Sequence, residues 1–338
     1  MRRKLSIILP CLLLAALAAG HTAAWFAGTH YLATGFNAWV ANRRAAGWQV
    51  DAGMPVRGGW PLAASLTVPG LALSAGPAGA PGRIDWRAER VVLSLAATSP
   101  DRLGIDLTGA QSVRIAPGPE VPYTADIFHA EVPLTRAQPT ATSGPTGSLQ
   151  VRNLHVRDAT IGLLTGQLTA SAAPALSLSA EAIDLPPGVT WAFGPHISSF
   201  AIDATLLGAL PPPGPLAAMA EAWHGAGGAV DISHLALGWG PLGLSATAHL
   251  GLDDRLQPEG TTKLRVIGYA KALEALAAQH VITKDAAMAA TAVLTLLSHA
   301  PQDGGTPEVE VPLTLRDSTL LMGKTPLVKV PDLVWPRG

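Results

Sequence analysis

The sequence has little cysteine and little charge. Of 338 residues only Cys11 is a cysteine, so the chain can form no intramolecular disulfide and no metal site built on several thiolates. Charged residues make up 14%, compared with about 25% in an average soluble protein. The formal net charge of −1 leaves no basic excess for a nucleic acid to recognise. The sequence therefore predicts no nucleic-acid partner and no cysteine-based metal centre.

Recognisable catalytic patterns are also missing. The chain has no P-loop, no G-x-S-x-G elbow, no H-E-x-x-H and no G-x-G-x-x-G between a strand and a helix. Asp231, Ser233 and His234 are close in sequence, but on a regular strand His234 would point away from the other two. The sequence predicts a protein that is not an enzyme and that holds no cofactor and no metal.

Tryptophan is unusually frequent, with nine residues against three tyrosines and five phenylalanines. One interpretation is that the tryptophans add bulk to a core otherwise built from small residues, since aromatic side chains dominate cores generally. The other is an apolar groove lined by Trp60, Trp86, Trp191, Trp223 and Trp239.

The N-terminus carries the pattern of a membrane segment. Arg2, Arg3 and Lys4 are followed by residues 5–28, which contain no charged side chain. About 20 apolar residues span a bilayer, and cations before the span favour a cytoplasmic N-terminus. This predicts a single-pass inner-membrane protein with most of the chain in the periplasm. A cleaved signal peptide that ends near Ala16-Leu17-Ala18 is the alternative and would release the chain into the periplasm.

The uncleaved anchor is favoured because the helical pattern continues beyond residue 28. Trp25, Phe26 and Tyr31 would form an aromatic belt at the membrane surface. Apolar residues then recur at helical spacing at Leu32, Phe36, Trp39 and Val40, and Gly47 can end the helix. Cleavage would divide this helix.

Beyond Trp48 the dominant period is two, which is typical of strands with one apolar face. Clear cases include residues 84–88, 103–107, 149–156, 176–180, 200–204 and 309–315. The longest case is residues 242–252. A polar break at Asp253-Asp254-Arg255 follows, where a hairpin or bend between strands is expected, and then a predicted turn at Pro258-Glu259-Gly260. Glycine, proline and aspartate separate the runs, as expected for antiparallel strands.

Three segments have helical spacing instead, namely residues 215–225, 269–281 and 284–299. The predicted fold is therefore α+β and predominantly antiparallel β, with one or more large curved sheets partly covered by a few helices and preceded by a transmembrane helix.

Two stretches have linker composition, residues 138–147 and 210–215. The predicted organisation is a membrane anchor or signal with a helical extension over 1–47, a β region over 48–210 and an αβ region over 211–338. The last two can equally form one continuous domain, with residues 210–215 as a loop within one sheet.

Several short motifs resemble one bacterial cell-envelope family. They lie at residues 43–48, 58–61, 239–242, 251–253, 256–260, 311–313, 321–323 and 333–336. Together they make the chain similar to the family named domain of unknown function 2125 (DUF2125). The resemblance implies a cell-envelope protein and no catalytic residues. Residues 251–260 also resemble the strand-turn units of AsmA-like envelope proteins, which are tied to lipid transport and membrane homeostasis.

Three functions remain open at this stage. The first is a membrane-anchored periplasmic protein that binds lipid or another envelope component on an apolar sheet face. The second is a structural or scaffolding envelope protein with no ligand. The third, ranked last, is an envelope hydrolase, which would need a nucleophile, a base and oxyanion donors brought together by the fold.

Overall fold

The computed structural model describes residues 2–76, 82–134, 144–212, 214, 216–298 and 307–335, with the side chains of helix α1 described from residue 13 onward. The chain divides into two compact units, Met1–Arg136 and Ala137–Gly338. Strands in both units pair antiparallel, and helices are fewer than strands. The predicted α+β class, predominantly antiparallel β, is confirmed.

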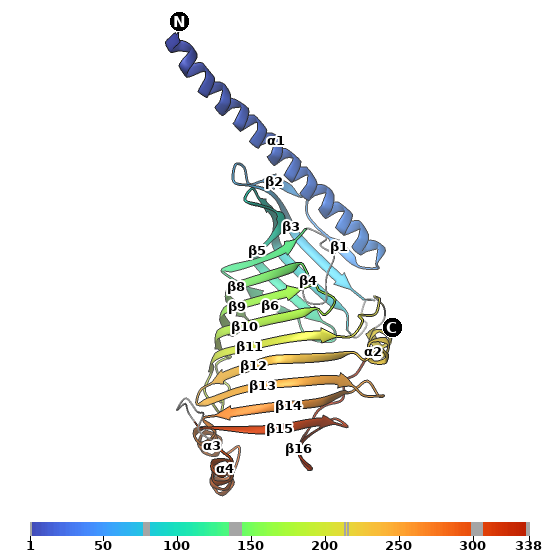
Figure 1. Cartoon of the computed structure of the whole chain (residues 1–338), viewed down its shortest axis with the longest axis vertical. Helices are drawn as coiled ribbons and strands as arrows, with labels where there is room; N and C mark the ends of the chain where they lie inside the picture. Colours follow the sequence, from blue (N-terminus) through green and yellow to red (C-terminus); the bar gives the residue numbers. More distant parts are fainter. Residues whose placement is uncertain are drawn as a thin grey trace. The chain divides into compact units, whose positions relative to one another are not determined.

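Unit 1 contains one long helix and one antiparallel sheet (Figure 1). Its elements are α1 (Arg2–Ala45), β1 (Gln49–Asp51), β2 (Val56–Gly58), β3 (Ala63–Ala75), β4 (Ile84–Ala96), β5 (Ser99–Ile115), β6 (Val121–Thr124) and β7 (Ile127–Pro133). Strand β3 pairs with β1, β2 and β4, and β5 pairs with β4, β6 and β7.

Helix α1 extends without interruption to Ala45, and Gly47 terminates it, as the sequence predicts. Gly47 has φ of 83°, a left-handed conformation that favours glycine. The N–H of Gly47 donates to the carbonyl of Arg44, and the N–H of Trp48 donates to that of Arg43, each at 3.0 Å. These two bonds form a Schellman motif, which satisfies the last carbonyls of the helix.

The predicted membrane segment, residues 5–28, is only partly covered by the description. The side chains of residues 2–12, including Cys11, lie outside the described residues. Among the helices that the structure does describe, none is long and apolar enough to be a candidate for crossing a membrane. The end of the predicted segment also packs on the folded body, because Nε2 of His21 lies 2.5 Å from the carbonyl oxygen of Pro61 and Nε1 of Trp25 donates to that of Gly58 at 3.0 Å.

The second half of α1 packs against the sheet of unit 1. Leu32 and Phe36 are buried on the strand-facing side of the helix. Leu66 and Val68 of β3 are buried in the same cluster, with 1% and 0% of their surface exposed. Gly28 permits the close approach, because a Cβ at that position would lie 2.7 Å from Cβ of Ala64.

Local irregularities keep the apolar residues of β3 and β4 on this one face. In β3 the buried positions change from Leu66 and Val68 to Leu71 at Gly70, which has φ of 60° and interrupts the pairing with β4 without shifting its register. The register of β4 with β5 shifts between Ala88 and Arg90, so the core-facing positions change parity there as well.

Unit 2 is an antiparallel sheet with three short helices. Its strands are β8 (Thr146–Val156), β9 (Ala159–Thr169), β10 (Ala175–Asp184), β11 (His196–Leu207), β12 (Ala229–Trp239), β13 (Leu242–Leu252), β14 (Pro258–Ile267), β15 (Glu308–Arg316), β16 (Thr319–Met322) and β17 (Thr325–Lys329). Each pairs with the next in chain order.

The three predicted helices are present as α2 (Leu216–Gly225), α3 (Tyr269–Ala278) and α4 (Lys284–Leu297). Helices α3 and α4 pack on each other and lie at one end of β13–β15 (Figure 1). The hydroxyl of Thr283 caps α4 by accepting a hydrogen bond from the N–H of Ala286.

The compact units divide after Arg136, whereas the sequence left residues 210–215 open as a boundary or as a loop within one sheet. Strands β11 and β12, on either side of residues 210–215, pair with each other, so this stretch is a loop within one sheet. The division instead adjoins the other predicted linker, 138–147, of which residues 138–143 lie outside the described residues.

The predicted turn at Pro258-Glu259-Gly260 is wrong, because these residues begin β14. The chain turns earlier, at Asp253–Gln257. One carboxylate oxygen of Asp253 accepts hydrogen bonds from the backbone N–H groups of Arg255 and Gln257, at 2.8 and 2.7 Å. A short acidic side chain that binds nearby amides is a common way to stabilise a turn.

Candidate functional site

An apolar cavity of about 430 Å³ lies in unit 1 between α1 and the sheet. The helix contributes Tyr31, Leu32, Gly35, Phe36 and Trp39, and the strands and the end of β7 contribute Leu71, Leu73, Trp86, Val91, Leu93, Leu103, Ile105, Leu107 and Leu134. All fourteen lining residues are aliphatic, aromatic or glycine. Small-molecule sites have volumes of roughly 300–1,000 Å³ and mainly apolar walls.

The cavity lies between the apolar face of the strands, which follows a period of two, and the apolar side of α1, which follows helical spacing. Leu103, Ile105 and Leu107 alternate along β5 and therefore share the face toward α1. Tyr31, with 56% of its surface exposed, and the exposed Gly35 mark the mouth of the cavity. An apolar chain could enter there without passing a charged lining residue.

The five tryptophans of the predicted groove are divided between the two units. Trp60 and Trp86 belong to unit 1, and Trp191, Trp223 and Trp239 belong to unit 2. Of the five, Trp86 lines the cavity, and its Nε1 donates to the hydroxyl of Tyr123 at 2.7 Å. A common groove lined by the five tryptophans therefore stays a prediction, and Trp86 alone of them lies in the cavity of unit 1.

In unit 2 the three tryptophans are half-buried and satisfied by backbone carbonyls. The rings of Trp191 and Trp239 are 6.2 Å apart, and Phe193 packs edge-on against Trp239 at 5.3 Å. Nε1 of Trp239 donates to Gly194, and Nε1 of Trp223 donates to Leu207. These rings fill the space between the sheet and its loops.

Unit 2 has an apolar face of its own. The strand register places one apolar residue from each of eight strands in a single row: Val151, Leu164, Ala180, Phe200, Leu237, Leu244, Val266 and Val309. Val151 and Val309 are buried, and most others in the row are half-buried. The one-sided strands predicted from the sequence thus form one continuous apolar surface across β8–β15.

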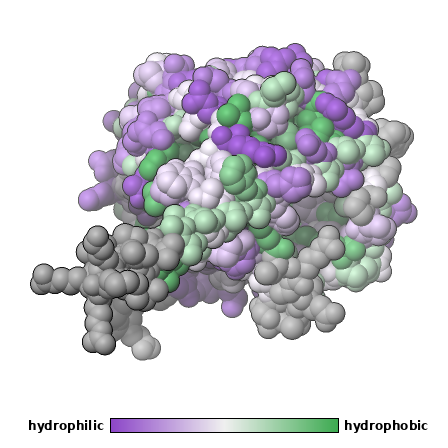
Figure 2. Space-filling view, turned by 90° about the horizontal axis from the view of Figure 1, so that it is seen from above, coloured by the Kyte–Doolittle hydropathy of each residue, from purple (hydrophilic) through white to green (hydrophobic). Residues whose placement is uncertain are grey.

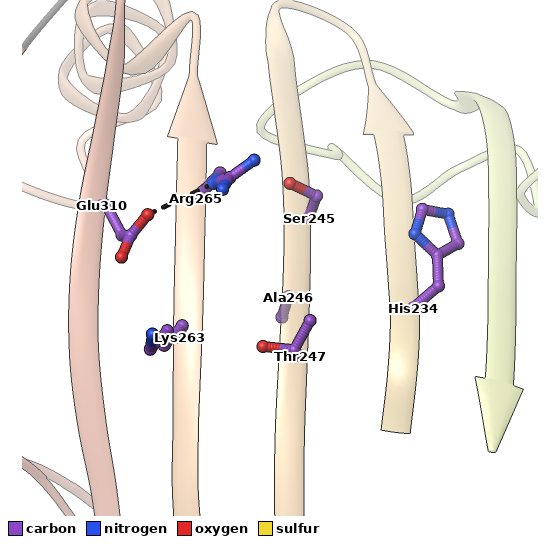
Figure 3. Close-up of a pocket in the computed structure, with 7 residues that line it drawn as sticks. All are labelled: His234, Ser245, Ala246, Thr247, Lys263, Arg265 and Glu310. Carbon is purple, nitrogen blue, oxygen red and sulfur yellow. Dashed lines mark hydrogen bonds and ion pairs between the residues drawn. The ribbon is translucent and has the colours of Figure 1, made fainter. Parts of the chain in front are cut away.

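A polar hollow of about 250 Å³ lies on β12–β15 of unit 2 (Figure 3). It is lined by His234, Ser245, Ala246, Thr247, Lys263, Arg265 and Glu310. Arg265 pairs with Glu310 at 3.3 Å, with both side chains substantially exposed to water. This is the solvated face of the sheet, where cations and hydroxyl groups remain hydrated.

The expectation that His234 points away from Asp231 is wrong. The register of β12 with β13 shifts between Ile232 and Leu235, so the strict alternation of side chains is interrupted. His234 consequently lines the polar hollow with Thr247, on the same face as the Asp231–His249 pair, whose nearest atoms are 3.6 Å apart.

Another polar cluster joins β5 and β7 in unit 1 and was not evident in the sequence, since its residues come from separate strands. Nδ1 of His129 lies 2.7 Å from the carboxylate of Asp106, and Nε2 lies 3.6 Å from that of Glu131. Partial burial opposes the charge of His129, but hydrogen bonds and attraction from the two carboxylates raise its pKa. Two neighbouring acids favour the imidazolium form of the ring, in which neither nitrogen has a lone pair available to accept a proton.

This cluster does not make a hydrolase site by geometry alone. Both ring nitrogens of His129 face carboxylates, which leaves neither directed at a nucleophile. Across the part of the chain that the structure describes, no group of three or more histidine, cysteine, aspartate or glutamate residues is placed to hold a metal ion.

The fold and the cavity define a class of protein: antiparallel β units, one of which encloses an apolar cavity beneath a long N-terminal helix. A family model matches residues 25–331, and the chain belongs to that family, described as an uncharacterized protein conserved in bacteria (DUF2125). The predicted resemblance to this family is confirmed. No curated protein and no solved structure matches the chain, and the likeness to AsmA-like proteins is not shown.

Proposed function

We propose that this protein is a non-enzymatic, membrane-attached component of the bacterial cell envelope that holds the acyl chain of a lipid in the cavity of unit 1. The observation that carries the proposal is the cavity itself, about 430 Å³ in volume with fourteen apolar or glycine lining residues. An apolar cavity of this kind excludes water and accepts apolar ligands.

The size of the cavity suits a fatty acyl chain. A group the size of a water molecule occupies roughly 30 Å³ in a liquid, so the cavity accommodates on the order of ten to fourteen methylene groups. Each buried methylene contributes about 0.8 kcal/mol, so ten would contribute about 8 kcal/mol before the cost of ordering the chain is subtracted. A gain of about 8 kcal/mol corresponds to a dissociation constant of about 1 μM, so ten methylenes set a micromolar limit on the affinity.

Membrane attachment is the second part of the proposal, and the N-terminal part of α1 would provide it. The support comes from Arg2, Arg3 and Lys4, from the uncharged stretch that follows, and from the continuity of α1 into the folded body. In this arrangement the helix enters the inner membrane and the two β units lie in the periplasm.

A ligand-free structural role is the second candidate. It is favoured by the complete burial of Val151 and Val309 in the apolar row of unit 2, because these side chains are covered without a ligand. The two candidates differ in what they require of unit 1, since only the lipid-binding role requires the cavity to be filled.

The test is to purify the full chain from membranes and to identify extracted lipids by mass spectrometry. A displacement assay with the fluorescent fatty acid cis-parinaric acid then measures binding. We expect one acyl ligand per chain, displaced by the probe. Purified protein that carries no acyl lipid and does not take up the probe would refute the lipid-binding proposal and favour the structural role.

A further inference from the structure

Large apolar side chains are exposed where β2 turns into β3. Trp60 is 58% exposed and Leu62 is 83% exposed, and Val56 just before the turn is 60% exposed. Exposed apolar residues are common singly, but a group of large ones on one turn indicates a surface that meets a partner. Figure 2 shows hydrophobic residues among hydrophilic ones on the face seen from above.

The turn is attached to helix α1. Nε2 of His21 lies 2.5 Å from the carbonyl oxygen of Pro61, a group that can only accept, so the histidine donates. Nε1 of Trp25 donates to Gly58 at 3.0 Å. A hollow of about 240 Å³ between helix and turn also reaches Ala97 and Pro100 beside the β4–β5 hairpin. The turn and the hairpin thus form one end of unit 1, termed here the tip, beside His21.

The tip carries no charge. Residues 58–82 contain no Asp, Glu, Lys or Arg, and neither do residues 96–100 of the hairpin. Arg57, immediately before the turn, is exposed. Asp101, directly after the hairpin, is exposed as well. An uncharged apolar end bordered by charged residues matches the interface of a membrane, where the hydrocarbon lies below polar headgroups.

The length of α1 before His21 also indicates that the partner of the tip is a membrane. Leu5–Gly20 comprises the sixteen uncharged residues that precede His21. At a rise of 1.5 Å per residue they extend about 24 Å, compared with a hydrocarbon core of about 30 Å. Because His21 is hydrogen-bonded to Pro61, a helix that places Leu5–Gly20 in the bilayer also places the tip at the lipid surface.

We infer that the tip of unit 1, centred on Trp60 and Leu62, inserts into the lipid interface of the membrane to which α1 is attached. The inference rests on the proposed membrane attachment and adds a second contact with the same bilayer. Tryptophan at the interface keeps its ring in the apolar boundary and its N–H near water.

The test uses the full chain with Cys11→Ser and one new cysteine carrying a nitroxide spin label. Leu62→Cys reports on the tip, Leu14→Cys on the exposed side of α1, and Ile115→Cys is the matched control. Ile115 is 58% exposed, like Trp60, and lies at the opposite end of the sheet, where β5 pairs with the start of β4. The protein is reconstituted in vesicles of phosphatidylethanolamine and phosphatidylglycerol.

Collision of the label with oxygen, which concentrates in lipid, is compared with collision with a water-soluble nickel chelate. We expect labels at 62 and 14 to have an oxygen-to-nickel ratio several-fold higher than the label at 115. A label at 62 that behaves like the one at 115, while position 14 is in lipid, overturns the inference and leaves membrane attachment standing. If both 62 and 14 report water, membrane attachment itself fails.

A second copy of the chain is the other surface that could cover the tip. It would shield position 62 from nickel without exposing it to oxygen, and the shielding would disappear when labelled protein is diluted with unlabelled protein. That outcome also overturns the inference. A further variant, Leu62→Ser, should lower the oxygen-to-nickel ratio at a label placed on Val56→Cys, whereas Ile115→Ser should leave it unchanged.

Discussion

The cavity of unit 1 can be filled from the helix side by Gly35→Leu. Gly35 lines the cavity, and a Cβ at this position would meet no atom within 4 Å. A leucine side chain adds four carbon groups, which at roughly 30 Å³ each occupy about 120 Å³, a quarter or so of the available volume. The added carbons take the place of about four methylenes of the ligand.

The expected effect follows from that displacement. Four methylenes at about 0.8 kcal/mol each amount to about 3 kcal/mol, which is on the order of a hundredfold weaker binding. The fold should not suffer, because replacing a glycine inside a helix by leucine gains roughly 0.5–1 kcal/mol of helix propensity. The variant should therefore melt no lower than the unmodified chain and bind cis-parinaric acid on the order of a hundredfold more weakly.

Gly20→Leu is the matched control, since it lies on the same helix, meets no atom within 4 Å and is outside the cavity. It gains the same propensity and should bind the probe as the unmodified chain does. Two results would refute the reasoning: probe binding that survives Gly35→Leu, or an equal loss in Gly20→Leu. The second would place the probe along the helix or in bound lipid.

Three further predictions concern the packing around the two units. Leu66→Ala removes a side chain that is 1% exposed and should cost about 2–5 kcal/mol in thermal unfolding, whereas Leu62→Ala, at an 83% exposed site, should change stability by less than about 0.5 kcal/mol. Asp85 accepts hydrogen bonds from Ser74, Arg114 and Arg83, which lower its pKa well below the ordinary value of 3.8. The stability that ionised Asp85 gives the fold is present above that value and is lost as pH falls through the lowered folded-state pKa. The melting temperatures of the unmodified chain and Asp85→Asn should therefore differ at pH 7 and converge in strong acid. Trp239→Ala removes a ring packed on Trp191 and Phe193 and should cost about 3–5 kcal/mol, seen by denaturant unfolding; a loss under 1 kcal/mol would mean that these rings do not hold the β10–β11 loop.

The class of fold could be predicted from the sequence because it depends on periodicity. Alternation at Leu103, Ile105 and Leu107 is enough to predict a strand with one apolar face, and that face lines the cavity. Gly47 similarly identified the end of α1, since a left-handed residue after a helix favours glycine.

Bulges are what the periodicity could not reveal. A single extra residue changes the face of every side chain that follows it, and nothing in local composition marks the shift between Ala88 and Arg90 or the one between Ile232 and Leu235 as the place where this happens. The error about His234 follows from this. The bend at Asp253-Asp254-Arg255 is confirmed, but the turn expected at Pro258-Glu259-Gly260 was wrong, because Pro258 is tolerated as the first residue of a strand.

The cavity itself needed the tertiary arrangement. The apolar residues of α1 and of β3–β5 were evident as separate patterns, yet neither pattern indicates that Phe36 and Leu32 pack onto this sheet or that their packing leaves a space. The predicted groove of tryptophans stays a prediction, because tryptophan spacing along the chain carries no information about which rings meet, and of the five only Trp86 lines the cavity.

The position of the cavity along α1 connects the proposed ligand with the proposed tip. His21 is hydrogen-bonded at the tip, and Tyr31 lies at the mouth of the cavity ten residues later, about 15 Å along the helix. A chain of ten to fourteen methylenes is of comparable length. If Trp60 and Leu62 rest in the lipid interface, an acyl chain could reach the cavity along the apolar side of α1 while its headgroup stays near the membrane surface. The two proposals are therefore coupled: raising the tip out of the membrane should slow the transfer of acyl chains from vesicles to the cavity without changing the affinity measured for a fatty acid in water.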